Sequence, residues 1–171
     1  SAILIDRETG TVLYEKDADR QMFPASITKV LTCLVVLQYM QANNISGDTV
    51  VTIGKVPELE QGATSIVLQE GEQMRLIDLI YGLMLPSGND AATALAEYVG
   101  GNVEDFATLM NETAQKAGAT HSHFVNANGL HDPQHYTTAR DMAAICQAAM
   151  ENEAFREIVS TKQYSCPEIG R

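Results

Sequence analysis

Residues 24 to 37 read PASITKVLTCLVVL and join a short polar turn to a long apolar run. The run is too long for a typical strand and has helix formers at most positions, so we expect a buried helix from about Ser26 to Ala42. Ser26 and Lys29 then lie three residues apart in its first turn, where their side chains share one face of the helix and can meet.

This spacing can pair a nucleophile with a base. A serine hydroxyl attacks well only when a neighbouring group removes its proton, and a lysine amine does this only when it is uncharged. Burial at the positive end of an apolar helix disfavours the ammonium form of Lys29. The alternative is that Ser26 caps the helix and Lys29 is a solvated surface charge.

A second polar pair lies in a short loop between two apolar segments. Residues 76–85 and 90–99 are predicted helices, and residues 86–89, which read PSGN, separate them. Ser87 and Asn89 are then held by a helix on either side, an arrangement that can direct polar groups into a cleft. The alternative is a plain helix stop, with Asn89 or the residue after it capping the next helix.

Ser-x-x-Lys followed by Ser-x-Asn is the order of motifs in penicillin-binding proteins and serine β-lactamases. Each string occurs once in this chain. The sequence therefore resembles the serine-type D-alanyl-D-alanine carboxypeptidases, which are the low-molecular-mass penicillin-binding proteins. Further stretches that look like this family are residues 2–16, 64–72, 87–92, 124–130 and 135–143.

The resemblance implies an α+β fold of the β-lactamase/transpeptidase-like type, in which a helical subdomain packs on an antiparallel sheet and the active site lies between them. Residues 1–171 would form one partial catalytic domain. The family's third motif, Lys-Thr-Gly on a strand beside the active site, is absent from these residues. We therefore expect a domain truncated before its C-terminal sheet strands, with little activity by itself and with possible self-association through an uncovered hairpin.

The activity implied by the resemblance is removal of the terminal D-alanine from the pentapeptide stem of peptidoglycan through an acyl-enzyme. Ser26 would attack the carbonyl between the two D-alanines, and Lys29 would take its proton. Ser87 would relay that proton to the leaving amine, and Asn89 would bind the substrate backbone. β-Lactams would acylate the same serine. The resemblance implies no metal and no organic cofactor, and it places the protein in the bacterial cell envelope, with any signal peptide or membrane anchor outside this chain.

Composition limits the other possibilities. A chain of 171 residues that is 45% hydrophobic can bury a core and fits one domain. Its net charge of −11, with no basic patch, argues against nucleic acid or an anionic membrane surface as a partner. We expect no transmembrane segment. The three cysteines have no metal or disulfide spacing and are expected as free thiols.

Periodicity and turn residues predict the secondary structure. Residues 2–6 and 11–15 should form a hairpin. Thr138 and Asp141 have the spacing of a capping box at the start of a helix. The other expected elements are short strands at 49–53 and 65–69, and helices at 75–85, 90–99, 103–117, 138–150 and 153–160.

Three alternative functions remain open. A serine β-lactamase is less favoured because Ser-Gly-Asn departs from the Ser-Asp-Asn of class A enzymes, and because Asp132 is the only acidic residue in the 121–136 loop. A non-catalytic wall-binding domain could keep the fold. A metal site could use the histidine cluster, although the motif spacing of a zinc protease is lacking; the histidines are His121, His123, His131 and His135.

Overall fold

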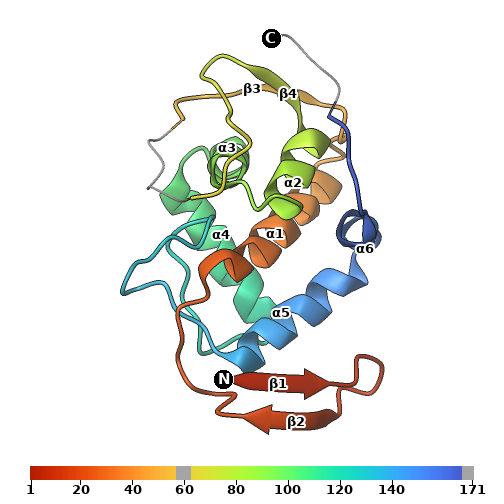
Figure 1. Cartoon of the computed structure of the whole chain (residues 1–171), viewed down its shortest axis with the longest axis vertical. Coiled ribbons are helices and arrows are strands. Elements are labelled where there is room, and N and C mark those ends of the chain that lie inside the picture. Colours follow the sequence, from red (N-terminus) through yellow and green to blue (C-terminus); the bar gives the residue numbers. More distant parts are fainter. Residues whose placement is uncertain (57–62, 167–171) are drawn as a thin grey trace.

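The computed structural model describes residues 1–56 and 63–166. Six α-helices, one short 3-10 helix and two separate antiparallel strand pairs make up this part of the chain (Figure 1). In chain order they are β1 (Ala2–Ile5), β2 (Val12–Lys16), η1 (Ala25–Ile27), α1 (Thr28–Ala42), β3 (Val50–Thr52), β4 (Gln73–Arg75), α2 (Leu76–Met84), α3 (Asn89–Gly100), α4 (Val103–Lys116), α5 (Ala139–Glu151) and α6 (Glu153–Ser160).

Helix α1 is the centre of the molecule. It contacts α2, α3, α4, α5 and α6, and Figure 1 shows these helices arranged around it. Residues 31 to 37 are all buried. A helix that is apolar on all sides is stable in water only when other elements enclose it. The apolar run at residues 30–37 therefore determines the helical architecture.

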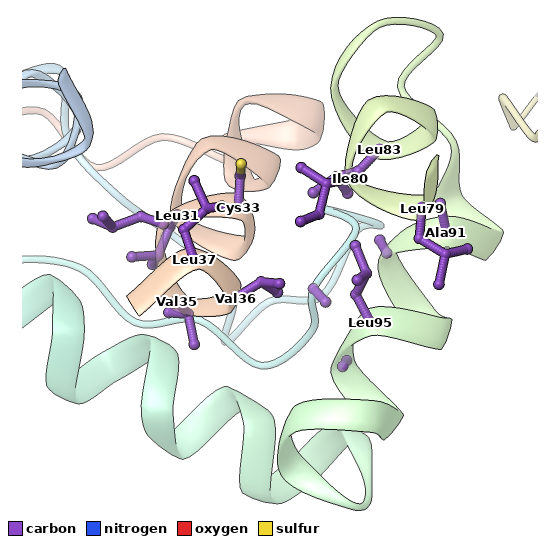
Figure 2. Close-up of a cluster of buried hydrophobic side chains, with 14 of the residues drawn as sticks. Leu31, Cys33, Val35, Val36, Leu37, Leu79, Ile80, Leu83, Ala91 and Leu95 are labelled. Carbon is purple, nitrogen blue, oxygen red and sulfur yellow. The ribbon is translucent and has the colours of Figure 1, made fainter. Parts of the chain in front are cut away.

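Part of the hydrophobic core is a cluster of aliphatic side chains from α1, α2 and α3. Figure 2 shows this cluster, in which Leu31, Val36, Leu79, Ile80 and Leu95 are fully buried. Complete burial of one such side chain stabilises the folded state by about 1.5–3 kcal/mol. The α2–α3 pair that carries Ser87 and Asn89 is thereby fixed against the helix that follows Ser26.

The N-terminal hairpin packs on α5 and leaves much of its other surface open. Strand β1 contacts α5, and Figure 1 shows the hairpin beside that helix. Arg140 in α5 bonds Glu15 at 2.6 Å and Asp19 at 2.7 Å. Leu13 is 61% exposed and Leu4 is 56% exposed. Within the described residues the hairpin pairs with no further strand, so the expected self-association stays a prediction.

The predicted strand at residues 65–69 is wrong. Strand β3 pairs instead with β4 at Gln73–Arg75, an element that the sequence analysis did not foresee. Residues 66 and 68 donate their backbone N–H groups to the carboxylate of Asp90, at 3.1 and 2.9 Å, and Val67 has a φ of +62°. A buried carboxylate therefore binds the donors that a strand ladder would use, and the backbone turns where a strand would stay extended.

Side chains cap the helices that start in the second half of the chain. Asn102 caps α4, Asn152 caps α6 and Thr138 caps α5, the last by accepting from the N–H of Asp141 at 3.0 Å. Thr138 thus caps α5 as the sequence predicts. The carboxylate of Asp141 does not complete the box, because it accepts instead from the N–H of His121 and the hydroxyl of Ser122.

One helical stretch is long and apolar enough to cross a membrane, contrary to the sequence-based expectation. Ala25–Ala42 has 18 residues and a mean hydropathy of 1.2. More than half of this stretch, 56%, is buried inside the protein. Length and composition alone are weak evidence for a span, since the core helix of a globular domain has the same properties.

Cys33 and Cys146 are free thiols, as the sequence predicts. Cys33 is fully buried in α1, and burial raises the pKa of its thiol to about 12. Burial also raises the pKa of Cys146, which is half-buried. Neither thiol is a reactive thiolate near neutral pH.

Candidate active site

Ser26 lies at the junction of η1 and α1. The preceding residue, Ala25, has a φ of +50°, a conformation that is uncommon for a residue with a Cβ atom. Ser26 itself is exposed. Ile27 occupies the cap position of α1 and no side chain caps that helix, so the alternative in which Ser26 is a helix cap does not match the structure.

Lys29 is buried beneath this serine, only 2% exposed. Its Nζ donates to the Oγ of Ser26 at 3.2 Å, to the Oδ1 of Asn89 at 2.6 Å and to the carbonyl oxygen of Asn128 at 2.9 Å. An ammonium group has three donors, and each has a partner here. Lys29 is therefore not a solvated surface lysine.

The environment of Lys29 favours the neutral amine. Burial lowers the pKa of Lys29 from 10.5 to about 8. Its three partners are a hydroxyl, a carboxamide and a peptide carbonyl, so no anion offsets the loss of hydration. At pH 7 about a tenth of the molecules then carry an uncharged amine, and at pH 9 about nine tenths do.

Asn89 is positioned by a tightly bonded turn between α2 and α3. Gly88 precedes α3, and its N–H donates to the carbonyl of Gly82 at 2.9 Å. A Cβ atom on Gly88 would lie 2.8 Å from that oxygen, so the turn needs glycine. The N–H of Asn89 donates to the carbonyl of Thr64 at 2.9 Å. These bonds leave the Asn89 side chain buried and directed at Lys29.

Ser87 is not hydrogen-bonded to the other predicted site residues. It is half-buried and has a φ of +63°. Its carbonyl accepts from the hydroxyl of Thr64 at 2.5 Å, but among the described residues its own hydroxyl bonds neither Ser26 nor Lys29. The structure thus joins Ser26 and Asn89 through the amine of Lys29, whereas Ser87, two residues before Asn89 in the chain, has no hydrogen bond to any of them.

The carbonyl of Asn128 is a part of the site that the sequence analysis did not assign. Its loop is shaped by side-chain bonds: the Oδ1 of Asn126 accepts from the N–H of Gly129 at 2.8 Å, and the Oδ1 of Asn128 accepts from the N–H of Leu130 at 3.0 Å. Such asparagine turns have a sequence signal, and this stretch was already among those resembling the family. Every residue has a backbone carbonyl, so nothing in the sequence indicates that the carbonyl of Asn128 contacts Lys29.

An open cleft of about 460 Å³ lies over Ser26. Among the described residues that line it none carries a carboxylate, although the chain as a whole has a net charge of −11. His131 is the titratable side chain in this lining. The full set is Phe23, Ala25, Ser26, Ala63, Thr64, Asn89, Asn128, Gly129, Leu130 and His131.

The histidines do not gather into a metal site in the part of the chain that the structure describes. No three side chains of His, Cys, Asp or Glu come together there. His135 is buried and bonds the hydroxyl of Thr28, whereas His121 and His131 are exposed. His131 packs edge-on against Phe23, with ring centroids 4.6 Å apart.

The sequence profile of one protein family matches almost the whole chain. That family is Peptidase_S11, D-alanyl-D-alanine carboxypeptidase, and the match covers residues 1–168. The chain belongs to this family. Among curated D-alanyl-D-alanine carboxypeptidases, DacC of Escherichia coli is 41% identical over 88% of the chain, and DacF of Bacillus subtilis is 35% identical over 94% of it.

Solved structures of the Peptidase_S11 relatives have the same fold. Penicillin-binding protein 6B from Escherichia coli superimposes with a TM-score of 0.91 at 32% identity, over 98% of this chain and 55% of that one. The Streptomyces K15 DD-transpeptidase gives 0.84 at 36% identity, over 95% and 64%. These matches confirm the predicted fold class. The chain spans about two fifths of the length of the curated relatives, 39% of DacC and 41% of DacF.

We predict that Gly129→Ala lowers the stability of the protein more than Gly118→Ala does. A Cβ atom on Gly129 would lie 1.9 Å from the carbonyl oxygen of Ala25, and Gly129 has a φ of +84°. Gly118 is a matched control, with a φ of +91° and open space around its Cβ position. Gly118→Ala should lower the free energy of unfolding by about 1–2 kcal/mol, and Gly129→Ala by about 1–3 kcal/mol more. Urea denaturation measures both, and equal losses would contradict the close approach of this loop to Ala25.

Proposed function

We propose that the protein of which these residues are part is a serine D-alanyl-D-alanine carboxypeptidase of the bacterial cell envelope, which trims the peptidoglycan stem peptide and is acylated by β-lactams. The observation that carries this proposal is the buried amine of Lys29, 3.2 Å from the exposed hydroxyl of Ser26 and without an anionic partner. Membership of the family supplies the substrate class. The names of the relatives support the same activity and β-lactam binding.

The first half of the reaction forms an ester. The neutral amine of Lys29 takes the proton of the Ser26 hydroxyl while its oxygen attacks the carbonyl carbon between the two D-alanines. The C–N bond then breaks, and the terminal D-alanine leaves as a neutral amine once it has gained a proton. Ser87 is proposed to relay this proton: its hydroxyl receives the proton that Lys29 took from Ser26 and gives its own to the leaving amine. The Ser87 hydroxyl has no hydrogen bond within the described residues, so it is available for this transfer.

The second half consumes water. A water molecule attacks the ester carbonyl, gives one proton to the Ser26 oxygen and the other to solvent, and releases the shortened peptide as a carboxylate. Asn89 can bind the substrate in both halves, because its Oδ1 is bonded to Lys29 and no described residue bonds its Nδ2. That amide N–H group can donate to a substrate carbonyl. The chemistry requires no metal ion and no organic cofactor.

A β-lactam presents an amide carbonyl to the same serine, so acylation follows the same first half. Rapid hydrolysis of that adduct, the activity of a β-lactamase, needs a base for the attacking water. Among the described residues that line the cleft none is Asp or Glu. Asp132 accepts from the N–H of Gln134 within its own loop. These observations favour the carboxypeptidase over a class A β-lactamase.

A labelled penicillin should form one covalent adduct, on the peptide that contains Ser26, in a version of the protein that carries the Lys-Thr-Gly strand. Ser26→Ala should abolish the adduct because, among the residues that the structure describes, no other hydroxyl is hydrogen-bonded to the Lys29 amine. Ser160→Ala, an exposed serine at the end of α6, is the matched control and should label fully. Peptide mapping by mass spectrometry gives the position, and an adduct elsewhere would refute Ser26 as the nucleophile.

Acylation should rise with pH around a midpoint near 8, because the neutral form of Lys29 is the base and its pKa is lowered to about 8 by burial. Lys29→Arg should slow acylation by at least about a hundredfold, since a guanidinium stays protonated and a positioned base contributes at least that factor. The exposed Lys116→Arg in α4 is the control. Stopped-flow acylation at pH 6 to 10 measures both effects, and near-normal rates in Lys29→Arg would rule out this base.

The 171 residues alone should release D-alanine far more slowly than a version that also carries the Lys-Thr-Gly strand. In the proposed reaction the oxyanion is held by the backbone N–H of Ser26 and by a second N–H from that strand. Loss of one such donor costs about 10²- to 10³-fold in turnover. Release of D-alanine from a diacyl D-alanyl-D-alanine peptide is the assay. Equal turnover by both versions would show that the strand has no such role.

A further inference from the structure

Residues 123–136 form a closed loop, called here the 123–136 loop. Its ends are joined by two backbone hydrogen bonds between His123 and Tyr136, of 2.8 and 2.9 Å. Near its start, Asn111 of α4 bonds both the N–H and the carbonyl of Phe124, at 2.9 and 2.7 Å. The loop is therefore anchored at its ends and to α4, and its middle contacts another element.

The 123–136 loop contacts the start of α1 and the residues that precede this helix. Three residues of α1, Thr28, Lys29 and Thr32, lie on one face of the helix, and each contacts the loop, as does Ala25 before the helix. The contacts are Ala25 with Gly129, Thr28 with His135 at 2.8 Å, Lys29 with the Asn128 carbonyl at 2.9 Å, and Thr32 with the Ala127 carbonyl at 2.6 Å. Lys29 lies in the middle of this face.

The hydrogen bonds of His135 define its protonation state. Its Nδ1 accepts from the N–H of Val125 at 3.1 Å, so this nitrogen carries no proton. The proton is therefore on Nε2, which donates to the hydroxyl oxygen of Thr28. His135 is only 2% exposed, and its ring packs edge-on against Phe124.

His135 keeps this neutral form over the pH range in which Lys29 titrates. Burial lowers the pKa of His135 to about 4, with Asp132 opposing the shift and His123 adding to it. Between pH 6 and 10 the imidazole therefore stays uncharged, and changes of pH in this range act on Lys29 and leave the Thr28–His135 bond in place.

We propose that Thr28 and His135 are positioning residues, which hold residues 127–129 on α1 and so keep water away from the Lys29 amine. They touch neither the nucleophile nor, in the proposed reaction, the substrate. They act through the Asn128 carbonyl, which lies on the same face of α1 and closes one side of the Lys29 site. Their relevance to catalysis depends on the function proposed above, whereas their effect on Lys29 does not.

Two effects on Lys29 oppose each other when the loop is released. Loss of the Asn128 carbonyl removes an acceptor for the ammonium form, which lowers the pKa of Lys29. Entry of water hydrates the ammonium, which raises it, and water also replaces the lost acceptor. Burial is the cause of the shift in the intact protein. Hydration therefore decides the outcome, and the pKa of Lys29 moves toward its ordinary value.

The test is a direct titration of the Lys29 amine by NMR, through its 15Nζ and 13Cε resonances. The chain has five lysines, at positions 16, 29, 55, 116 and 162, and Lys29→Arg identifies the signal. Thr28→Val removes one hydroxyl, and His135→Leu removes both ring nitrogens. In each variant the midpoint for Lys29 should rise by about one pH unit or more above that of the unaltered chain.

Conservative variants separate positioning from mere stability. Thr28→Ser keeps the acceptor, and His135→Gln places an N–H donor near the position of Nε2, so both should titrate like the unaltered chain. His121→Gln, at an exposed histidine, should also leave the midpoint unchanged. If His135→Leu fails to fold, Thr28→Val decides alone. Unchanged midpoints in Thr28→Val and in a folded His135→Leu would overturn the proposal, whatever their stability.

The same variants, made in the version that carries the Lys-Thr-Gly strand, distinguish this inference from the proposed function. If Lys29 is the base, the pH midpoint of β-lactam acylation should move with the titration midpoint. A shifted titration with an unshifted acylation profile would keep the positioning role and remove Lys29 as the base. Acylation that is reduced equally at every pH, with the Lys29 midpoint unchanged, would mean that Thr28 and His135 only stabilise the fold.

Discussion

The structure of the site depends on one buried amine. Lys29 is 2% exposed, and its three hydrogen-bond partners come from different parts of the chain, at Ser26, Asn89 and Asn128. An ammonium group is costly to remove from water when no anion faces it. Lys29 therefore becomes less basic, and a side chain that would be an inert cation at the surface acquires a neutral form near physiological pH.

That burial requires a rigid helix beneath the amine. Helix α1 is enclosed by the other described helices, so its first turn has little freedom to bring the amine to solvent. Two of the five non-glycine residues with a positive φ in the described part of the chain lie at the site, Ala25 just before Ser26 and Ser87 in the turn between α2 and α3. Strained residues persist where the surrounding structure holds them, and they are typical of sites that must be preorganised.

The segments around the cleft are held by side-chain hydrogen bonds in place of strand ladders. Asp90 binds the backbone of residues 65–68, and that segment in turn supports the Ser87 turn through Thr64. In the 123–136 loop, the side chains of Asn111 and His135 likewise accept from backbone N–H groups. The side chains of Asp90, Asn111 and His135 are buried or half-buried, so breaking one of their bonds leaves an unpaired group at a cost of about 1–3 kcal/mol. The cleft walls are irregular in conformation and still well defined.

The sequence by itself determined most of the local elements and the spacing of Ser26 and Lys29. The apolar run at residues 30–37 determined a buried helix because no other element suits that length and composition, and the three-residue spacing placed Ser26 and Lys29 on one face. Gly and Pro marked where the helices end, because they act through the backbone alone. Thr138 likewise marked the start of α5 because a cap is a local interaction.

Only the tertiary structure decided what depends on partners far away in the chain. Residues 65–69 have the composition of a strand, but Asp90 takes their donors and β4 pairs with β3 in their place. The Asn128 carbonyl accepts from Lys29 because Gly129 lets the loop backbone approach the backbone of Ala25. The sequence does not indicate this contact, since every residue has a backbone carbonyl. The lowered pKa of Lys29 is also tertiary in origin. It comes from burial of the amine by Asn89 and Asn128, which lie 60 and 99 positions further along the chain.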